Sequence, residues 1–219
     1  MLYVFDDLKR IITSNVASAT MTFLDKGNAA AGRGPGPGPG GPPPGNGPGP
    51  GPGGPPPGTG PGPGRGKPQG DWDETVVAVG RGAEGFDVAP GGRELWAANA
   101  QDGTISIVDI AGKKVTQTLA ADVMGANRLK FTPDGKLVLV STLNGPDVSI
   151  FDAATRSVVK RVKVGRGAAG ILLQPDGSRA FIGCTPDDYV AIIDLKSLAV
   201  IGHIDAGKQP DGLAWAVRR

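Results

Sequence analysis

Three cationic residues occupy the same position of an internal repeat. Arg81 and Arg166 each end a Val-Gly-Arg triplet, and Lys208 ends the related Ala-Gly-Lys. If the repeats bring these loops to one mouth of a central channel, their charges can attract a small anionic ligand or a protein partner. The alternative, which we favour, is that they are solvated loop charges or partners of neighbouring repeats, since the repeat itself explains their recurrence. They are therefore retained only as candidate ligand-binding residues.

Asp87 and Lys130 carry opposite charges at another shared repeat position. Both fall on the strand expected to lie innermost in adjacent repeats, where they can line the channel and contribute to the same ligand site. Unpaired charges in a partly buried position are costly. We therefore expect an ion pair between neighbouring repeats.

Four aspartates recur, each closing an alternating run of apolar residues, and such a set suggests a metal site or an acid pair. There is only one per repeat, however, so the four carboxylates should lie far apart. The structural interpretation is that each carboxylate caps backbone N–H groups of the turn that follows it. The four are Asp25, Asp109, Asp152 and Asp194. No metal site is predicted from them.

The sequence contains one histidine, His203, and one cysteine, Cys184. Sites built from several His ligands, or from His together with Cys, cannot be assembled within one such chain. No Ser or Cys near His203 suggests a nucleophile pair, so a half-exposed histidine on a strand is expected. Cys184 is expected to be a small buried thiol. The sequence predicts no catalytic residue and no cofactor.

Charge and hydropathy exclude two classes of partner. Lys plus Arg is 23 and Asp plus Glu is 21, which leaves a net charge of +2 on the 219 residues. These charges are scattered, so a nucleic-acid partner is not predicted. No apolar run approaches the ~18 residues that a membrane helix needs. The first residues also lack the long apolar core of a secretory signal.

The elements that would position these residues follow from the repeat. The turn Pro90-Gly91-Gly92 recurs at residues 133–135 and 175–177, and the aspartate-closed runs recur with the same spacing. Four copies begin near residues 1, 85, 128 and 170, and a further strand is expected at 212–217. Each copy predicts four short strands, such as Phe86–Ala89, Glu94–Ala98, Thr104–Asp109 and Lys114–Ala120. A four-strand unit of ~40–45 residues is typical of a propeller blade.

A segment rich in Gly and Pro interrupts the first copy. The aspartate-to-glycine spacing is 13 residues in the third copy (165 − 152) but 55 in the first (80 − 25). The segment is therefore an insertion between the third and fourth strands, and we expect residues 27–73 to be disordered. Glycine does not fall at every third position, which excludes a collagen triple helix.

These strings resemble the YVTN β-propeller repeats, with lactonase-like propellers as relatives. The resemblance rests on 95–99 (Leu-Trp-Ala-Ala-Asn), 103–109 (Gly-Thr-Ile-Ser-Ile-Val-Asp), 133–136 (Pro-Asp-Gly-Lys) and 209–215 (Gln-Pro-Asp-Gly-Leu-Ala-Trp). Two copies depart from it, because Thr142 and Cys184 replace the motif asparagine. The resemblance implies an all-β propeller of four antiparallel four-stranded blades plus one C-terminal strand, in a periplasmic or secreted protein.

The sequence favours a non-catalytic binding or structural module, because a propeller is a scaffold onto which sites are built. The alternative is a lactonase-like hydrolase or a cofactor-dependent propeller enzyme. Three arrangements of the blades remain open: a partial propeller, a homodimer completing an eight-bladed ring, or four blades closed with Leu213–Val217 competing for the place of Leu2–Phe5. Trp96 and Trp215 are expected in the core.

Overall fold

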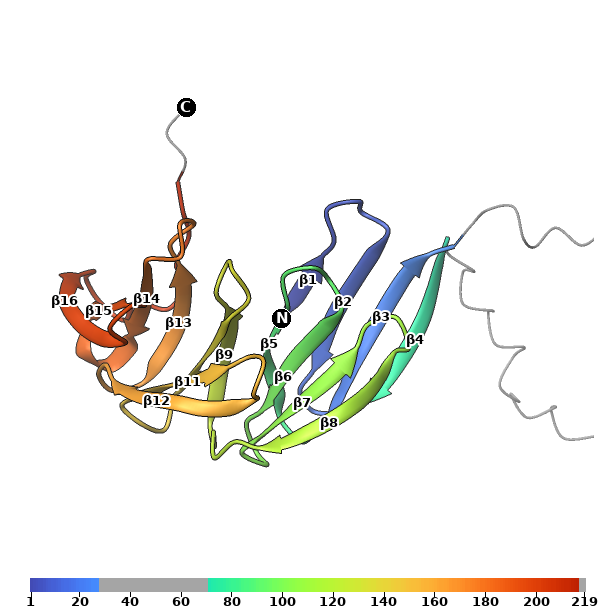
Figure 1. Ribbon diagram of the computed structural model, residues 1–219, viewed down its shortest axis with the longest axis horizontal. Coiled ribbons are helices and arrows are strands. Elements are labelled where there is room, and N and C mark those ends of the chain that lie inside the picture. The colour runs from blue at the N-terminus through green and yellow to red at the C-terminus, as the bar shows by residue number, and fades with distance from the viewer. Residues whose placement is uncertain (28–70, 217–219) are drawn as a thin grey trace, which may run out of the picture. The chain divides into compact units, whose positions relative to one another are not determined.

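The computed structural model describes residues 1–27 and 71–216, which form strands almost throughout (Figure 1). Most of the predicted disordered insertion lies outside the described residues. The described part contains one short 3-10 turn, η1 (Thr185–Asp187). No helix among those residues has the length and apolar character needed to cross a membrane.

The sixteen strands form four antiparallel sheets, each made of four strands that are consecutive in the sequence. We call these sheets blades 1 to 4. Blade 1 contains β1 (Leu2–Val4), β2 (Arg10–Asn15), β3 (Thr20–Lys26) and β4 (Trp72–Ala78); blade 2 contains β5 (Ala83–Val88), β6 (Glu94–Asn99), β7 (Thr104–Asp109) and β8 (Lys114–Ala120); blade 3 contains β9 (Ala126–Phe131), β10 (Leu137–Thr142), β11 (Asp147–Asp152) and β12 (Ser157–Lys163); blade 4 contains β13 (Ala168–Leu173), β14 (Arg179–Cys184), β15 (Tyr189–Asp194) and β16 (Ala199–Asp205). The predicted fold class is confirmed.

The recurring Pro-x-Gly turn joins the first two strands of a blade. In blade 3, Asp134 Oδ1 accepts hydrogen bonds from Thr132 Oγ1 at 2.7 Å and from the Lys136 N–H at 3.1 Å. Gly135 has a φ of +70°, in the left-handed region that glycine adopts without a steric penalty. Asp176 and Gly177 repeat this arrangement in blade 4. The turn residues thus fix the hairpin locally.

Three apolar cores hold the four blades together, one between each pair of neighbours. The third strand of a blade is buried on both faces: the inner four residues of β7 and of β11 are all buried. The fourth strands, β8 and β12, are mostly exposed. Because blades 2 and 3 each pack between two others, their stability depends on both of their neighbours.

The first strands begin earlier than the sequence predicts. Strand β5 starts at Ala83 and β13 at Ala168, whereas the apolar runs indicated starts at Phe86 and Ile171. Register shifts near the start of β5 and β13 mark β-bulges in these strands. An extra residue interrupts the alternation of apolar and polar side chains, so the pattern does not reveal the first three residues of β5 and β13.

Blades 1 and 4 lie at opposite ends of the row of blades (Figure 1). The segment 209–216 lies against blade 4, where Trp215 Nε1 donates to Leu173 O at 2.8 Å and Thr185 Oγ1 donates to Pro210 O at 2.9 Å. It therefore does not compete with β1 of its own chain. Within the described part it is not hydrogen-bonded into a sheet. Trp215 is 46% exposed, so its predicted place in the core is wrong.

Candidate functional site

The start of each first strand has the same backbone geometry in blades 2, 3 and 4. A glycine with left-handed φ precedes the strand, with values of +72°, +70° and +57° at Gly82, Gly125 and Gly167. A β-bulge follows. Bulges re-aim side chains and are enriched beside binding sites. Two residues after the glycine, at the bulge, stand Glu84, Asn127 and Ala169.

These bulged positions border one hollow, which we call the inner-strand pocket. Its polar lining consists of Glu84, Asn127, Arg128, Thr185 and Asp211, and Leu143, Gly167, Ala169 and Pro186 complete it. The volume is about 430 Å³. Small-molecule sites typically measure ~300–1,000 Å³ and combine an apolar lining with a few convergent polar groups. The volume of the pocket, which is open to solvent, falls within this range.

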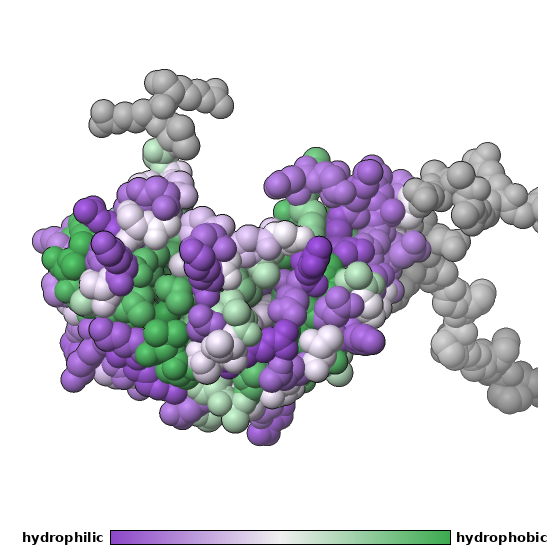
Figure 2. Space-filling model, in the orientation of Figure 1, coloured by the Kyte–Doolittle hydropathy of each residue, from purple (hydrophilic) through white to green (hydrophobic). Residues whose placement is uncertain are grey.

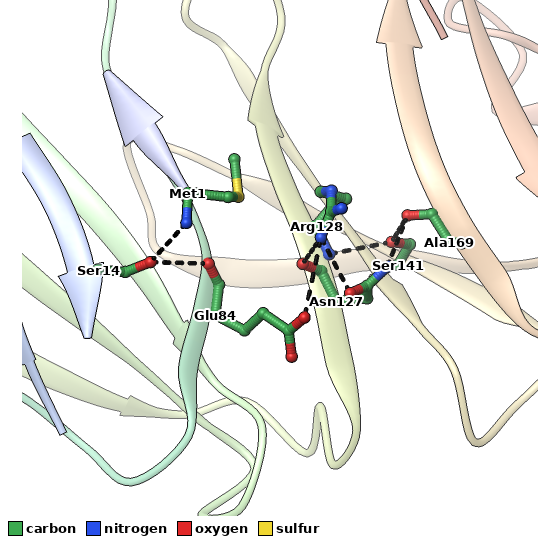
Figure 3. A network of polar contacts seen from close by, with 7 residues as sticks. All are labelled: Met1, Ser14, Glu84, Asn127, Arg128, Ser141 and Ala169. Atoms are coloured by element: carbon green, nitrogen blue, oxygen red, sulfur yellow. Dashed lines mark hydrogen bonds and ion pairs between the residues drawn. The ribbon is translucent and has the colours of Figure 1, made fainter. Parts of the chain in front are cut away.

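Hydrogen bonds between blades fix the backbone around the pocket (Figure 3). Ser14 Oγ donates to the Glu84 carbonyl at 3.3 Å, and Ser141 Oγ, at the equivalent position of blade 3, donates to the Ala169 carbonyl at 3.0 Å. Asn127 Nδ2 donates to the same Ala169 carbonyl at 3.3 Å. Each serine thus ties its own blade to the first strand of the next, which holds the pocket rigid.

Arg128 supplies the positive charge of the pocket. Its Nη1 donates to the Asn127 carbonyl at 3.0 Å and to Asn127 Oδ1 at 2.9 Å, and lies 4.0 Å from Glu84 Oε1. The equivalent positions in blades 2 and 4 are Gly85 and Gly170, where a side chain would clash with the carbonyl of the next first strand. Blade 3 therefore places a guanidinium where its neighbours have no side chain.

The three predicted cations are each held by an aspartate of a nearby loop. Arg81 Nε donates to Asp102 Oδ1 at 2.7 Å, and Arg166 Nε donates to Asp187 Oδ1 at 2.7 Å. The backbone N–H of each arginine also donates to its aspartate, and these bonds hold the pKa values of Asp102 and Asp187 below their ordinary range. The arginine side chains stay about three-quarters exposed, at 73% and 74%.

Lys208 follows the same pattern. Its Nζ donates to Asp188 Oδ2 at 2.8 Å, and this bond is the main cause of the lowered pKa of Asp188. In blade 3 the equivalent cation and acid positions hold Met124 and Gly145, so both charges of the pair are missing together. Arg166 also borders a neighbouring hollow of about 350 Å³, which shares Leu143, Gly167 and Pro186 with the inner-strand pocket.

Asp87 and Lys130 form the predicted ion pair between blades. Lys130 Nζ lies 3.3 Å from Asp87 Oδ1, and the Phe131 N–H donates to Asp87 Oδ2 at 3.0 Å. Burial raises the pKa of Asp87, although the charge of Lys130 opposes this shift. The pair joins β5 of blade 2 to β9 of blade 3, which is a structural role.

The recurring aspartates cap turns in blades 2, 3 and 4. Asp152 Oδ1 accepts from the Thr155 N–H, and Asp194 Oδ1 from the Ser197 N–H, both at 2.7 Å. Asp109 Oδ2 accepts from the Gly112 N–H at 2.6 Å. The prediction is therefore confirmed for these three, and for Asp25 the equivalent turn lies outside the described residues. Asp25 forms ion pairs with Arg10 and Lys113.

The two remaining candidate groups, Cys184 and His203, pack against other side chains of the described residues. Cys184 is fully buried, and burial raises the pKa of its thiol to about 11, which confirms the predicted inert thiol. The ring of His203 packs edge-on against Tyr189, with centroids 4.5 Å apart. No group of three His, Cys, Asp or Glu side chains within 1–27 and 71–216 is arranged to hold a metal ion.

Sequence reasoning missed the polar residues of the inner-strand pocket. Glu84, Asn127 and Asp211 share one repeat position, three residues after Arg81, Met124 and Lys208 respectively. The alignment of the internal repeats that identifies the cations also places these three polar residues at one shared position. It was overlooked because the first strands were expected to begin after these residues.

The sequence matches no known family model and no curated protein. Its structure is similar to that of hydrazine synthase from Kuenenia stuttgartiensis (TM-score 0.63, 19% identity, 92% of this chain and 47% of that chain). It is also similar to a protein of unknown function from Desulfotomaculum acetoxidans (0.68, 10%, 95% and 56%). A third is a Bacteroides fragilis protein assigned as a 6-phosphogluconolactonase (0.64, 15%, 96% and 55%).

At such low identities these similarities establish the fold and not the activity. The chain spans about half the length of each of these proteins. Its four-stranded blades, the cores between them and these structural neighbours identify the fold as a β-propeller.

Proposed function

We propose that this chain is a propeller module that binds a small polar ligand in the inner-strand pocket, without catalysis. The observation that carries the proposal is Arg128. Within the described residues its side chain donates hydrogen bonds through Nη1, and Nε and Nη2 can serve a ligand. A guanidinium in a fixed, half-buried position favours a carboxylate or phosphate, which it binds with two parallel hydrogen bonds.

The rest of the pocket favours a ligand that also carries hydroxyl groups. The carboxylates of Glu84 and Asp211 are hydrogen-bond acceptors on the same pocket as Arg128. A ligand with one anionic group and several hydroxyls satisfies both kinds of protein group. Sugar acids have this chemistry. The predicted anionic ligand is thus retained, and its proposed binding group is Arg128, with Arg166 in the adjoining hollow.

Isothermal titration calorimetry with D-gluconate and 6-phosphogluconate tests this proposal. Replacing Arg128 with alanine should weaken binding by about 10-fold to 100-fold, the effect of one lost charge-assisted hydrogen-bonding group. Lys136→Ala, in an exposed turn, is the matched control and should bind normally. Failure of both compounds to bind the unaltered protein, or equal binding by Arg128→Ala, would refute the proposal.

Arg81→Ala separates this pocket from the predicted ring of loop cations. If the ligand binds in the inner-strand pocket, Arg81→Ala should bind as tightly as the unaltered protein, because Arg81 is not among the lining residues. An equal loss in Arg81→Ala and Arg128→Ala would favour a wider site at the channel mouth that includes Arg81, Arg166 and Lys208.

A second candidate function is lactone hydrolysis, favoured by the similarity to the protein assigned as a 6-phosphogluconolactonase. In this proposal the Glu84 carboxylate takes a proton from water as the oxygen adds to the lactone carbonyl, and Arg128 stabilises the oxyanion. The ring C–O bond then breaks, and the leaving oxygen receives the proton. Hydrolysis of δ-gluconolactone above its spontaneous rate, lost in Glu84→Gln, would support it; an unchanged rate would exclude it.

A further inference from the structure

The segment 209–216 begins as the first strand of a blade begins. Gln209 has a φ of +53°, at the repeat position where Gly82, Gly125 and Gly167 are also left-handed. Two residues later, the Asp211 carbonyl approaches Gly170 just as the Asn127 carbonyl approaches Gly85. A non-glycine residue in this conformation is uncommon. The surrounding contacts of blade 4 therefore impose the geometry of a first strand.

Side-chain packing of the segment also matches that of a first strand. Trp215 meets Phe181 edge-on, with ring centroids 5.7 Å apart, and Trp96 meets Phe131 in the same way at 5.6 Å. The two pairs occupy equivalent repeat positions, two blades apart. Segment 209–216 thus has the place and contacts of a fifth first strand, without the second strand that would pair with it in the described part of the chain.

The face of blade 4 beneath this segment is only partly covered. Phe181 and Ile192 are partly exposed, whereas their equivalents Trp96 and Ile107 in blade 2 are buried by blade 3. Apolar surface gathers over the β13–β16 end of the molecule in Figure 2. The apolar face that blade 2 buries against blade 3 is therefore covered in blade 4 by segment 209–216 alone, within the described part of the chain.

In blade 1, the uncovered face is the one that would pack against a preceding blade. Leu2 is 64% exposed and Val4 is 42% exposed, whereas the equivalent Phe86 and Val88 of blade 2 are only 1% and 6% exposed. Strand β1 is also short, with three residues against six in β5. The innermost strand of blade 1 is therefore weakly held, because no preceding blade packs on it.

These two faces are complementary because of the repeat. The exposed face of blade 4 is the one that blades 1, 2 and 3 pack against the blade that follows them. The exposed face of blade 1 is the one that blades 2, 3 and 4 pack against the blade that precedes them. At the inter-blade ion-pair position, Leu172 would face Ala214, the equivalent of Tyr3, so this contact leaves no charge unpaired there.

We infer that two copies of this chain associate end to end into a closed ring, with the segment 209–216 of each copy replacing β1 in the other. Leu213 is equivalent to Leu2, so it would lie opposite Thr13 of the second copy, in the register that Leu2 has with Thr13. Head-to-tail contacts close into a ring when the rotation per copy allows it and otherwise form filaments. The association does not depend on what the pocket binds.

A cysteine pair tests the strand exchange directly in the full chain. In the Leu213→Cys, Thr13→Cys variant, opposed residues of antiparallel strands lie within the Cα separation that a disulfide spans. Mild oxidation should give a covalent dimer on non-reducing gels. Leu213→Cys with Ser18→Cys, an exposed loop residue, is the matched control and should stay uncrosslinked. The native Cys184 is buried and should not react.

Light scattering after size exclusion measures the assembly itself. The unaltered protein should have the mass of two chains at micromolar concentration. Trp215→Ala should raise the dimer dissociation constant at least about tenfold, as loss of a central aromatic contact does. Met124→Ala, which removes a similarly exposed apolar side chain elsewhere, should not. A monomer, a filament, or a dimer that forms no 13–213 disulfide would overturn the inference.

Discussion

Blades 1 and 3 are built from the same repeat but differ in what covers them. Leu129 in β9 of blade 3 is fully buried, and Leu2 at the equivalent position of blade 1 is 64% exposed. Both residues lie in a strand that pairs with its neighbour in the sheet. The difference shows that the repeat specifies the strand, whereas burial of its side chains requires a second blade. Stability in such a fold resides mainly between blades.

The largest expected effect on stability comes from truncating the buried leucine of this pair. Leu129→Ala should lower the free energy of unfolding by about 2–5 kcal/mol, because it leaves a cavity in the core between blades 2 and 3. Leu2→Ala should change it by less than about 0.5 kcal/mol, the usual range for an exposed site. Urea denaturation followed by circular dichroism measures both. A large loss in Leu2→Ala would show that another chain or segment covers β1.

A smaller effect contrasts two ion pairs. Lys130→Met should lower the free energy of unfolding by about 1–3 kcal/mol, because it leaves the buried Asp87 carboxylate without its charged partner. Adding Asp87→Asn should recover part of that loss. Lys208→Met should have no measurable effect, because Lys208 is 91% exposed and a solvated pair contributes little. The same denaturation experiment measures these variants, and equal losses at both sites would contradict the distinction.

The smallest effect concerns the titration of two aspartates. Burial raises the pKa of Asp87, whereas the backbone N–H of Thr155 lowers that of Asp152. A raised pKa in the folded state stabilises the fold at low pH, and this stabilisation is lost as the pH rises through that pKa. The lowered pKa of Asp152 acts in the opposite direction, so its stabilisation is lost as the pH falls through it. Carboxyl NMR titration should place Asp87 above and Asp152 below the ordinary aspartate value; the reverse order would disprove this.

Spacing alone predicted the strands that keep strict alternation. The third strands of blades 2, 3 and 4 end at their aspartates as expected, because the run of alternating residues and the capping turn are both local. The predicted starts of β5 and β13 are three residues too late, because a bulge adds an unpaired residue and interrupts the alternation. For this reason the prediction left out Glu84 and Asn127, which lie at the bulges. A break in the alternation beside a recurring glycine would have been the signal for them.

The sequence by itself determined the four-stranded repeat, the turns and the pairing of Asp87 with Lys130, because these depend on local residue types at a fixed spacing. Only the tertiary structure decided which equivalent residues are buried, as the contrast between Phe181 and Trp96 shows. It also brought Arg128, Glu84 and Asp211 to one pocket. The reason is that burial and convergence depend on the blade that packs alongside, and the spacing within one repeat carries no information about its neighbour.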